Sequence, residues 1–128
     1  MKLSVIIPVY NEVESIEAIL KRVQDTKLVN EIVVVDDGSK DGTRDILKTL
    51  DGKGGVRVIL HEKNQGKGAA VRTGMTSAQG DILLIQDADL EYDPADYPAV
   101  LGPILQGKAD AVFGSRFAAA SQRKVLLF

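Results

Sequence analysis

Short apolar runs rich in valine and isoleucine alternate along this chain with longer segments in which apolar residues recur at helical spacing. The runs predict strands at residues 3–7, 31–36, 56–60, 81–86 and 110–114. The second and fourth runs are almost continuously apolar, which is typical of strands buried on both faces of a parallel sheet. Because neighbouring parallel strands need a crossover connection, we expect right-handed βαβ units in an α/β, doubly wound, mostly parallel sheet flanked by helices.

The intervening segments predict helices that pack one apolar face on this sheet. Helical apolar spacing is found at residues 13–23, 46–50, 67–78 and 97–105. Ser39 or Asp41 would cap the second helix. In the third helix Ala70, Gly74 and Ala78 lie on one face, and their small size permits close packing on the sheet.

Length and composition narrow the possible functions. A chain of 128 residues suits a single domain. The formal net charge of −2 argues against binding to nucleic acid, which normally requires a basic excess. The chain has no cysteine, which excludes disulfide scaffolds, cysteine-ligated zinc and thiol catalysis.

Neither a secretory signal nor a membrane span is recognisable. The apolar stretch at residues 3–9 is too short for a signal peptide, and no run approaches the roughly 18 to 20 apolar residues that span a bilayer. We therefore expect a cytoplasmic location. The apolar end at residues 125–128 has no cap or polar tail, which indicates a polypeptide cut within an element.

An aromatic ring, an amide and a carboxylate follow the first predicted strand as Tyr10, Asn11 and Glu12. The ring could stack on a planar base, and the carboxylate could accept hydrogen bonds from ribose hydroxyls or base N–H groups. A turn followed by a helix cap explains the same residues, with Glu12 favoured by the helix dipole.

Two adjacent carboxylates, Asp36 and Asp37, end the second predicted strand. Such a pair is costly to bury unless it is hydrogen-bonded or solvated in a cleft. One of them could hold the fold while the other faces a ligand. An Asx turn and helix cap would account for Ser39, Asp41 and Gly42 more readily than for both carboxylates.

The segment at residues 64–70 superficially resembles a phosphate-binding loop. It lacks the Walker spacing, because no glycine precedes Gly66 at the required distance and no Ser or Thr follows Lys67. Its glycines would let the loop enter a helix tightly, with the helix N-terminus near an anion.

The most informative cluster follows the fourth predicted strand, where Asp87, Asp89 and Glu91 alternate with other residues. In extended backbone these positions share a face, so the carboxylates could point into one cleft. Carboxylates without His or Cys favour Mg²⁺ or Mn²⁺, which keep open positions for phosphate oxygens. A solvated acidic loop is the alternative.

An arginine and the single histidine lie near the ends of predicted strands. Arg116, after the last predicted strand, could pair with a phosphate or with one of the carboxylates, or lie on the surface. His61 is the only histidine and is expected to be a surface residue at a strand end, so Ser-His-Asp hydrolysis has no support.

Taken in order, five motifs resemble the inverting family 2 glycosyltransferases, which have the GT-A, Rossmann-like nucleotide-diphospho-sugar transferase fold. They lie at residues 8–12, 35–39, 64–68, 87–89 and 114–117 and span essentially the whole chain. The motifs are most similar to those of dolichyl- or polyprenyl-phosphate mannose and glucose synthases. The resemblance implies that residues 1–128 are the donor-binding part of a truncated catalytic domain, with the acceptor part largely missing.

The resemblance also implies roles for individual residues. The donor nucleotide would be bound by Pro8, Tyr10, Glu12, Val35, Asp37, Asp87 and Ala88. Asp89, with Asp87 and Glu91, would hold Mg²⁺ or Mn²⁺ on the diphosphate. Family members often have Gln in place of Glu91, which leaves its role open. Asp89 and Arg116 would act in catalysis, with Arg116 facing the donor phosphates or a phosphate acceptor.

The implied reaction is metal-assisted transfer of a hexose, with inversion, from a nucleotide sugar of the GDP-mannose or UDP-glucose type. A polyprenyl or dolichyl phosphate acceptor is already anionic and needs little general base catalysis. Such an acceptor would place the full-length parent at the cytoplasmic face of a membrane. A non-catalytic nucleotide-binding α/β module and a nucleotidyltransferase are the alternatives. A response-regulator-like domain is disfavoured, because the third strand ends at His61 rather than at an aspartate.

Overall fold

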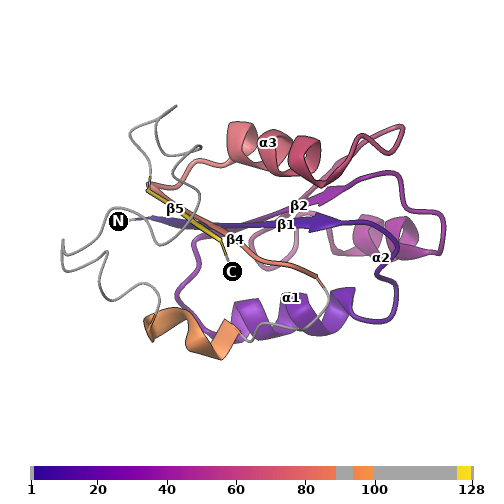
Figure 1. Ribbon diagram of the computed structural model, residues 1–128. Coiled ribbons are helices and arrows are strands. Elements are labelled where there is room, and N and C mark those ends of the chain that lie inside the picture. Colours follow the sequence, from indigo (N-terminus) through magenta and orange to yellow (C-terminus); the bar gives the residue numbers. More distant parts are fainter. Residues whose placement is uncertain (1, 89–93, 100–123, 128) are drawn as a thin grey trace.

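The computed structural model describes residues 2–88, 94–99 and 124–127, and these form a parallel sheet between two layers of helices (Figure 1). The sheet has five strands in the order β3-β2-β1-β4-β5, all paired in parallel. The strands are β1 (Leu3–Val9), β2 (Glu31–Asp36), β3 (Val56–Leu60), β4 (Ile82–Ile85) and β5 (Lys124–Leu127). The predicted doubly wound parallel α/β sheet is therefore confirmed.

The strand predictions agree closely with the structure over the part of the chain that it describes. β2 and β3 have the predicted bounds, whereas β4 is one residue shorter at each end. β1 continues two residues further, because Pro8 and Val9 pair with Val35 and Asp36 of β2. The predicted strand at 110–114 lies outside the described residues. The apolar end of the chain, predicted only as a cut element, contributes β5 beside β4.

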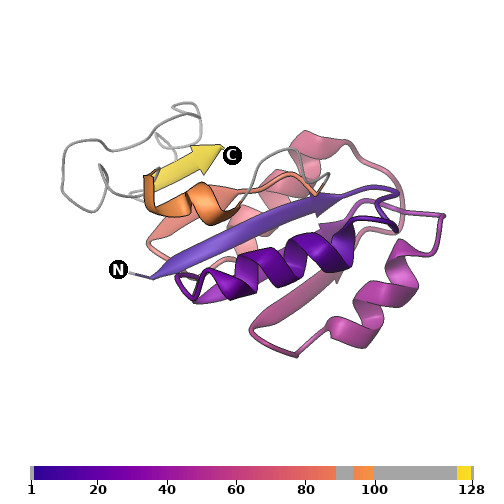
Figure 2. The same ribbon diagram turned by 90° about the horizontal axis from the view of Figure 1, so that it is seen from below.

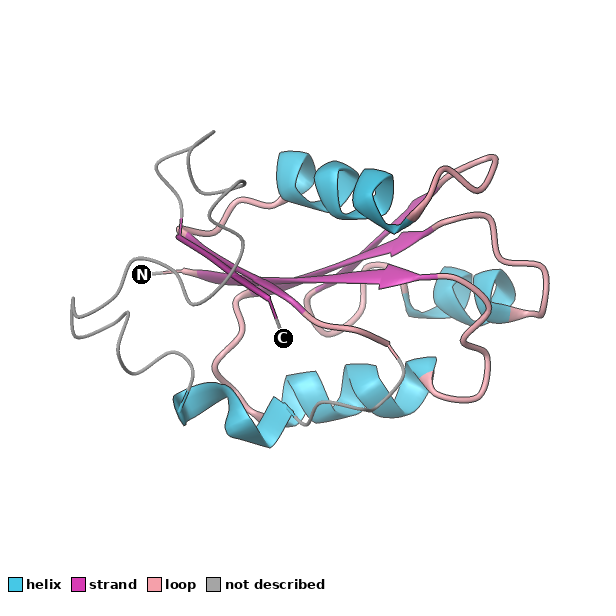
Figure 3. Cartoon of the chain, viewed as in Figure 1, coloured by secondary structure: helices cyan, strands magenta, loops and turns pink. Residues whose placement is uncertain are grey.

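Helices cover both faces of the sheet, as Figure 3 shows by colour. α1 (Ile16–Asp25) and α2 (Thr43–Leu50) pack on one face, which is viewed in Figure 2, and α3 (Lys67–Ser77) packs on the other. A short 3₁₀ helix, η1 (Pro94–Asp96), lies near α1. Among the described residues no helix is both long and apolar enough to cross a bilayer.

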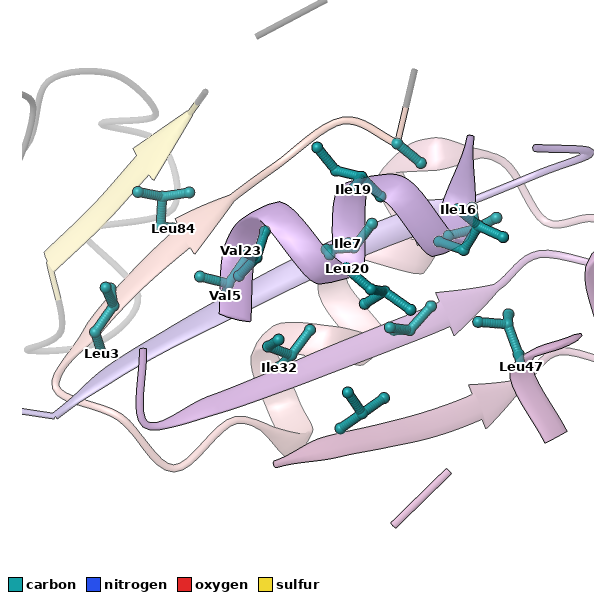
Figure 4. Close-up of a cluster of buried hydrophobic side chains, with 14 of the residues drawn as sticks. Leu3, Val5, Ile7, Ile16, Ile19, Leu20, Val23, Ile32, Leu47 and Leu84 are labelled. Atoms are coloured by element: carbon teal, nitrogen blue, oxygen red, sulfur yellow. The ribbon is translucent and has the colours of Figure 1, made fainter. Parts of the chain in front are cut away.

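The alternation of side chains along β1 divides the core into two clusters. Val5, Ile7 and Val9 face α1 and α2, whereas Ile6 faces α3. Figure 4 shows the first cluster, in which the apolar stripe of α1 lies over β1. Val13 was predicted to extend this stripe, but α1 begins at Ile16, and Val13 lies in the preceding turn.

The close packing predicted for the small-residue face of α3 is present. Ala70, Gly74 and Ala78 are buried against the sheet, and a Cβ added at Gly74 would clash with the Ile6 side chain in the core.

We expect Gly74→Ala to lower the free energy of unfolding by about 1 to 3 kcal/mol, because overpacking outweighs the gain in helix propensity. Gly68→Ala in the same helix is the matched control, since its Cβ would meet only Arg72 Nη1 at 3.5 Å. Urea denaturation of both variants tests this. Equal effects of the two substitutions would contradict tight packing at Gly74.

Candidate nucleotide and metal site

A cavity of about 450 Å³ opens at the carboxyl ends of the strands. From β1 the chain proceeds to β2 and β3 on one side and then crosses to β4 on the other, so strand order reverses between β1 and β4. Ligands of doubly wound sheets bind in the crevice outside such a switch point. The residues lining this cavity are Pro8, Val9, Tyr10, Glu12, Asp37, Asn64, Gly66, Lys67, Ala70, Asp87 and Ala88.

Pro8 helps to explain why the crevice opens here. Pairing of β1 with β4 ends at Ile6 and Ile85, with one more bond from the Gln86 N–H to the Ile6 carbonyl. Successive residues of a strand direct their backbone groups to opposite neighbours, so Pro8 faces the same side as Ile6. Because proline has no N–H, it offers β4 no donor at the position where the two strands separate.

Most of the predicted donor-binding residues line this cavity. They are Pro8, Tyr10, Glu12, Asp37, Asp87 and Ala88. The Val35 side chain does not line it, because alternation along β2 turns this residue into the fully buried cluster under α3. The predicted residues Asp89, Glu91 and Arg116 lie outside the described residues.

Hydrogen bonds between the loops after β1 and β2 hold Tyr10 at the cavity. Asn11 adopts the left-handed backbone conformation, with a φ of 54°, at the turn after β1. Its N–H donates to Ser39 Oγ at 2.8 Å, and its Oδ1 accepts from the Lys40 N–H at 2.8 Å. Ser39 thus joins two loops rather than capping α2. Asp41 does stabilise the start of that helix, because its Oδ1 accepts from the Thr43 N–H at 3.0 Å. Tyr10 itself is 46% exposed.

Ser15 links the start of α1 to the segment after β4, a role that the sequence did not indicate. Its Oγ lies 2.6 Å from the Ala88 carbonyl and 3.0 Å from Glu12 Oε2. On the N-terminal side of Asp87, the Tyr97 hydroxyl donates to Gln86 Oε1 at 2.7 Å. Burial raises the pKa of Tyr97. Ser15 thus holds the backbone after Asp87, and Tyr97 holds the side chain of the residue before it.

The two carboxylates after β2 have different partners. Asp36 is fully buried, forms a 3.0 Å ion pair with Arg44 and accepts from the Ser39 N–H at 3.1 Å. Asp37 lies at the cavity and accepts from the backbone N–H groups of Gln65 at 2.8 Å and Gly66 at 2.9 Å. One carboxylate therefore holds the fold, and the other holds a loop that lines the cavity.

His61 is buried, contrary to the predicted surface position. Only 8% of the residue is exposed, with Nδ1 2.9 Å from Asp37 Oδ1 and Nε2 2.9 Å from Thr73 Oγ1. The imidazole is enclosed because it contacts Thr73 of α3 on one side and Asp37 on the other, and both partners are distant in sequence. Burial tends to raise the pKa of Asp37, but the hydrogen bonds from Gln65, His61 and Gly66 outweigh this effect and lower it.

The loop at residues 64–67 lines the cavity although it lacks the Walker pattern. Gly66, at a φ of 98°, precedes the first residue of α3, Lys67. The Lys67 ammonium forms an ion pair with Asp87 Oδ1 from the opposite wall. The only sequence signal for this loop was its glycines directly before a predicted helix. The sequence did not indicate that Lys67 pairs with Asp87.

A family model described as "Glycosyl transferase family 2" matches residues 4–125. The chain belongs to glycosyl transferase family 2. It is similar to a dolichol-phosphate mannosyltransferase of Pyrococcus furiosus, with 41% identity over 91% of this chain and 34% of the relative. An undecaprenyl-phosphate 4-deoxy-4-formamido-L-arabinose transferase of Aeromonas hydrophila is 38% identical over 81% of this chain and 34% of the relative. The chain thus spans about a third of the length of these curated relatives.

Solved structures of glycosyltransferases confirm the predicted GT-A fold of this family 2 chain. Staphylococcus aureus TarS 1-349 superposes with a TM-score of 0.72 and 28% identity, over 89% of this chain and 37% of that one. The mannosyltransferase PcManGT of Pyrobaculum calidifontis, in complex with GDP-Man and Mn²⁺, gives a TM-score of 0.63 and 31% identity. That match covers 69% of this chain and 27% of the other.

The chemistry of the cavity wall is compatible with the divalent cation found in such complexes. Asp87 presents a carboxylate to the cavity, and hard cations prefer oxygen ligands. Over the described ranges no group of three or more His, Cys, Asp or Glu residues is placed to hold a metal. Magnesium is usually held by one or two carboxylates plus phosphate oxygens, so a single carboxylate in this part of the chain fits that chemistry.

Proposed function

We propose that this chain is the donor-binding part of a glycosyltransferase that moves a hexose from a nucleotide diphosphate sugar to an acceptor with inversion. The supporting observation is the cavity at the β1–β4 switch point, whose wall combines Tyr10, Glu12 and Asp87. An aromatic ring, a carboxylate for hydroxyl groups and a carboxylate for a cation are the groups that a nucleoside diphosphate requires.

In this proposal the residues after β1 bind the nucleoside. The Tyr10 ring stacks on the base, since nearly half of the residue is exposed at the cavity. Glu12 accepts from ribose hydroxyls, and Ser15 holds its carboxylate in position. Asp37 acts mainly by holding the Gln65–Gly66 backbone against the cavity.

Asp87 and Asp89, with Glu91 as a further candidate, would hold Mg²⁺ or Mn²⁺. When bound, the metal neutralises the charge that develops on the departing diphosphate. Arg116 would face the donor phosphates or the acceptor. The two relatives described above are named for polyprenyl-phosphate acceptors, which supports a lipid phosphate acceptor and a membrane-associated parent. Such an acceptor is anionic and attacks without a strong base.

We expect calorimetry to detect Mn²⁺-dependent binding of GDP or UDP to this chain, weakened more than about tenfold by Asp89→Ala through loss of a metal ligand. Asp25→Ala, at the exposed end of α1, is the matched control and should bind like the unmodified chain. Nucleotide binding that is independent of metal and unchanged in Asp89→Ala would contradict the proposed metal site.

A panel of nucleotide sugars tested with the full-length parent distinguishes transfer from binding alone. Release of nucleoside diphosphate with GDP-mannose, UDP-glucose or a related donor is the expected result. Metal-dependent binding without turnover across the panel would identify a non-catalytic nucleotide-binding module. Pyrophosphate release from a nucleoside triphosphate would identify a nucleotidyltransferase.

A further inference from the structure

The Lys67–Asp87 ion pair joins two walls of the cavity that are distant in sequence. Lys67 is the first residue of α3, and Asp87 follows β4. The Lys67 ammonium contacts Asp87 Oδ1, and the two side chains are 63% and 28% exposed. Exposed pairs of this kind contribute little stability, so the lysine can leave without disrupting the fold. The Asp87 backbone stays in place, because its carbonyl accepts from Gln86 Nε2 at 3.2 Å.

The charges around the cavity make this lysine unusual. Among the described lining residues, Glu12, Asp37 and Asp87 are acidic, and Lys67 is the only Lys or Arg. A divalent cation on the Asp87 carboxylate would take the place of the Lys67 ammonium, because two positive charges on the same carboxylate repel each other. The lysine and the metal therefore compete for the same carboxylate. An anionic diphosphate in the cavity offers the displaced ammonium a new partner.

We propose that Lys67 is an exchangeable counter-ion of Asp87, which a divalent cation displaces and which then pairs with the diphosphate of the donor. The second step rests on the proposed function, whereas the first depends only on the ion pair. Lys67 therefore has opposite effects on the two ligands. It weakens binding of the metal alone and strengthens binding of the metal–nucleotide complex.

The first test measures Mn²⁺ binding without nucleotide, by the electron paramagnetic resonance signal of free Mn²⁺. We expect Lys67→Met to bind Mn²⁺ about three- to fivefold more tightly, since its Asp87 has lost a competing cation. Lys63→Met is the matched control, because Lys63 is exposed directly before the loop at residues 64–67 but does not line the cavity. Circular dichroism melting of each variant verifies that the fold is intact.

The second test measures binding of GDP and UDP at saturating Mn²⁺ by calorimetry. We expect Lys67→Met to weaken the binding of the preferred nucleotide about tenfold, because a charge-assisted contact with phosphate is lost. Lys67→Arg keeps the positive charge and should recover most of the affinity. Lys63→Met should bind like the unmodified chain.

Three results would overturn the inference. Unchanged or weaker Mn²⁺ binding by Lys67→Met, including no binding at millimolar Mn²⁺, would exclude competition for Asp87. Unchanged nucleotide affinity in Lys67→Met would exclude pairing with the diphosphate. An equal response of Lys63→Met would mean that both effects arise from the change in net charge alone. If the unmodified chain binds no nucleotide but Lys67→Met still gains Mn²⁺ affinity, the proposed function fails while the counter-ion exchange stands.

Discussion

Arg44→Met is expected to lower the free energy of unfolding by about 3 kcal/mol, because it leaves the Asp36 carboxylate buried without its cation. Asp36 is fully buried at the end of β2, and Arg44 Nε lies 3.0 Å from its Oδ2. Arg44 Nη2 also donates to the His61 carbonyl at 2.8 Å, so the same side chain joins α2 to the end of β3. Chemical denaturation at neutral pH measures the loss.

A double-substitution cycle separates the ion pair from the packing of the arginine stem. Asp36→Asn combined with Arg44→Met should recover a large part of the loss, because the buried charge is then absent. Lys48→Met, at an exposed position of the same helix, should stay within about 0.5 kcal/mol of the unmodified chain. A loss that is the same in the single and the double substitution would mean that packing, rather than charge, accounts for it.

Asp37→Asn is expected to cost about 3 kcal/mol at pH 7, because one of its two oxygens becomes an amide group that cannot accept a hydrogen bond. Three donors converge on this carboxylate, from Gln65, Gly66 and the His61 ring. The substitution also frees the loop at residues 64–67, so we expect weaker nucleotide binding together with the lower stability. Urea denaturation measures the first effect and calorimetry the second.

The stabilisation by Asp37 should depend on pH in the acid range. Backbone and His61 hydrogen bonds hold its folded-state pKa below the ordinary aspartate value of 3.8. A lowered carboxyl pKa contributes stability that is fully present above the unfolded pKa and is lost as the pH falls through the folded pKa. The difference between the unmodified chain and Asp37→Asn should therefore shrink steadily below about pH 4. A constant difference between pH 7 and pH 3 would show that the charged form of Asp37 is not what stabilises the fold.

Local patterns in the sequence predicted most of the described strands and helices, and they marked the residues that follow the strands as candidates for the site. The apolar runs predicted the bounds of β2 and β3, and the small residues of α3 predicted its close packing on the sheet. Polar residues directly after β1, β2 and β4, which the sequence marked as possible ligand-binding groups, do line the cavity. These inferences succeed because side-chain periodicity and burial are properties of short segments.

The partners within the site were decided only by the tertiary structure. His61 is buried between Thr73 of α3 and Asp37. Asp37 meets the Gln65 and Gly66 backbone because the end of β2 lies beside the loop before α3. Lys67 meets Asp87 across 20 positions of sequence. Strand order brings Asp37, Lys67 and Asp87 to one cavity. That order depends on how helices and strands pack over long sequence separations. The residue types of the site could therefore be predicted from the sequence, whereas its hydrogen bonds and charge pairs were set by the packing of distant segments.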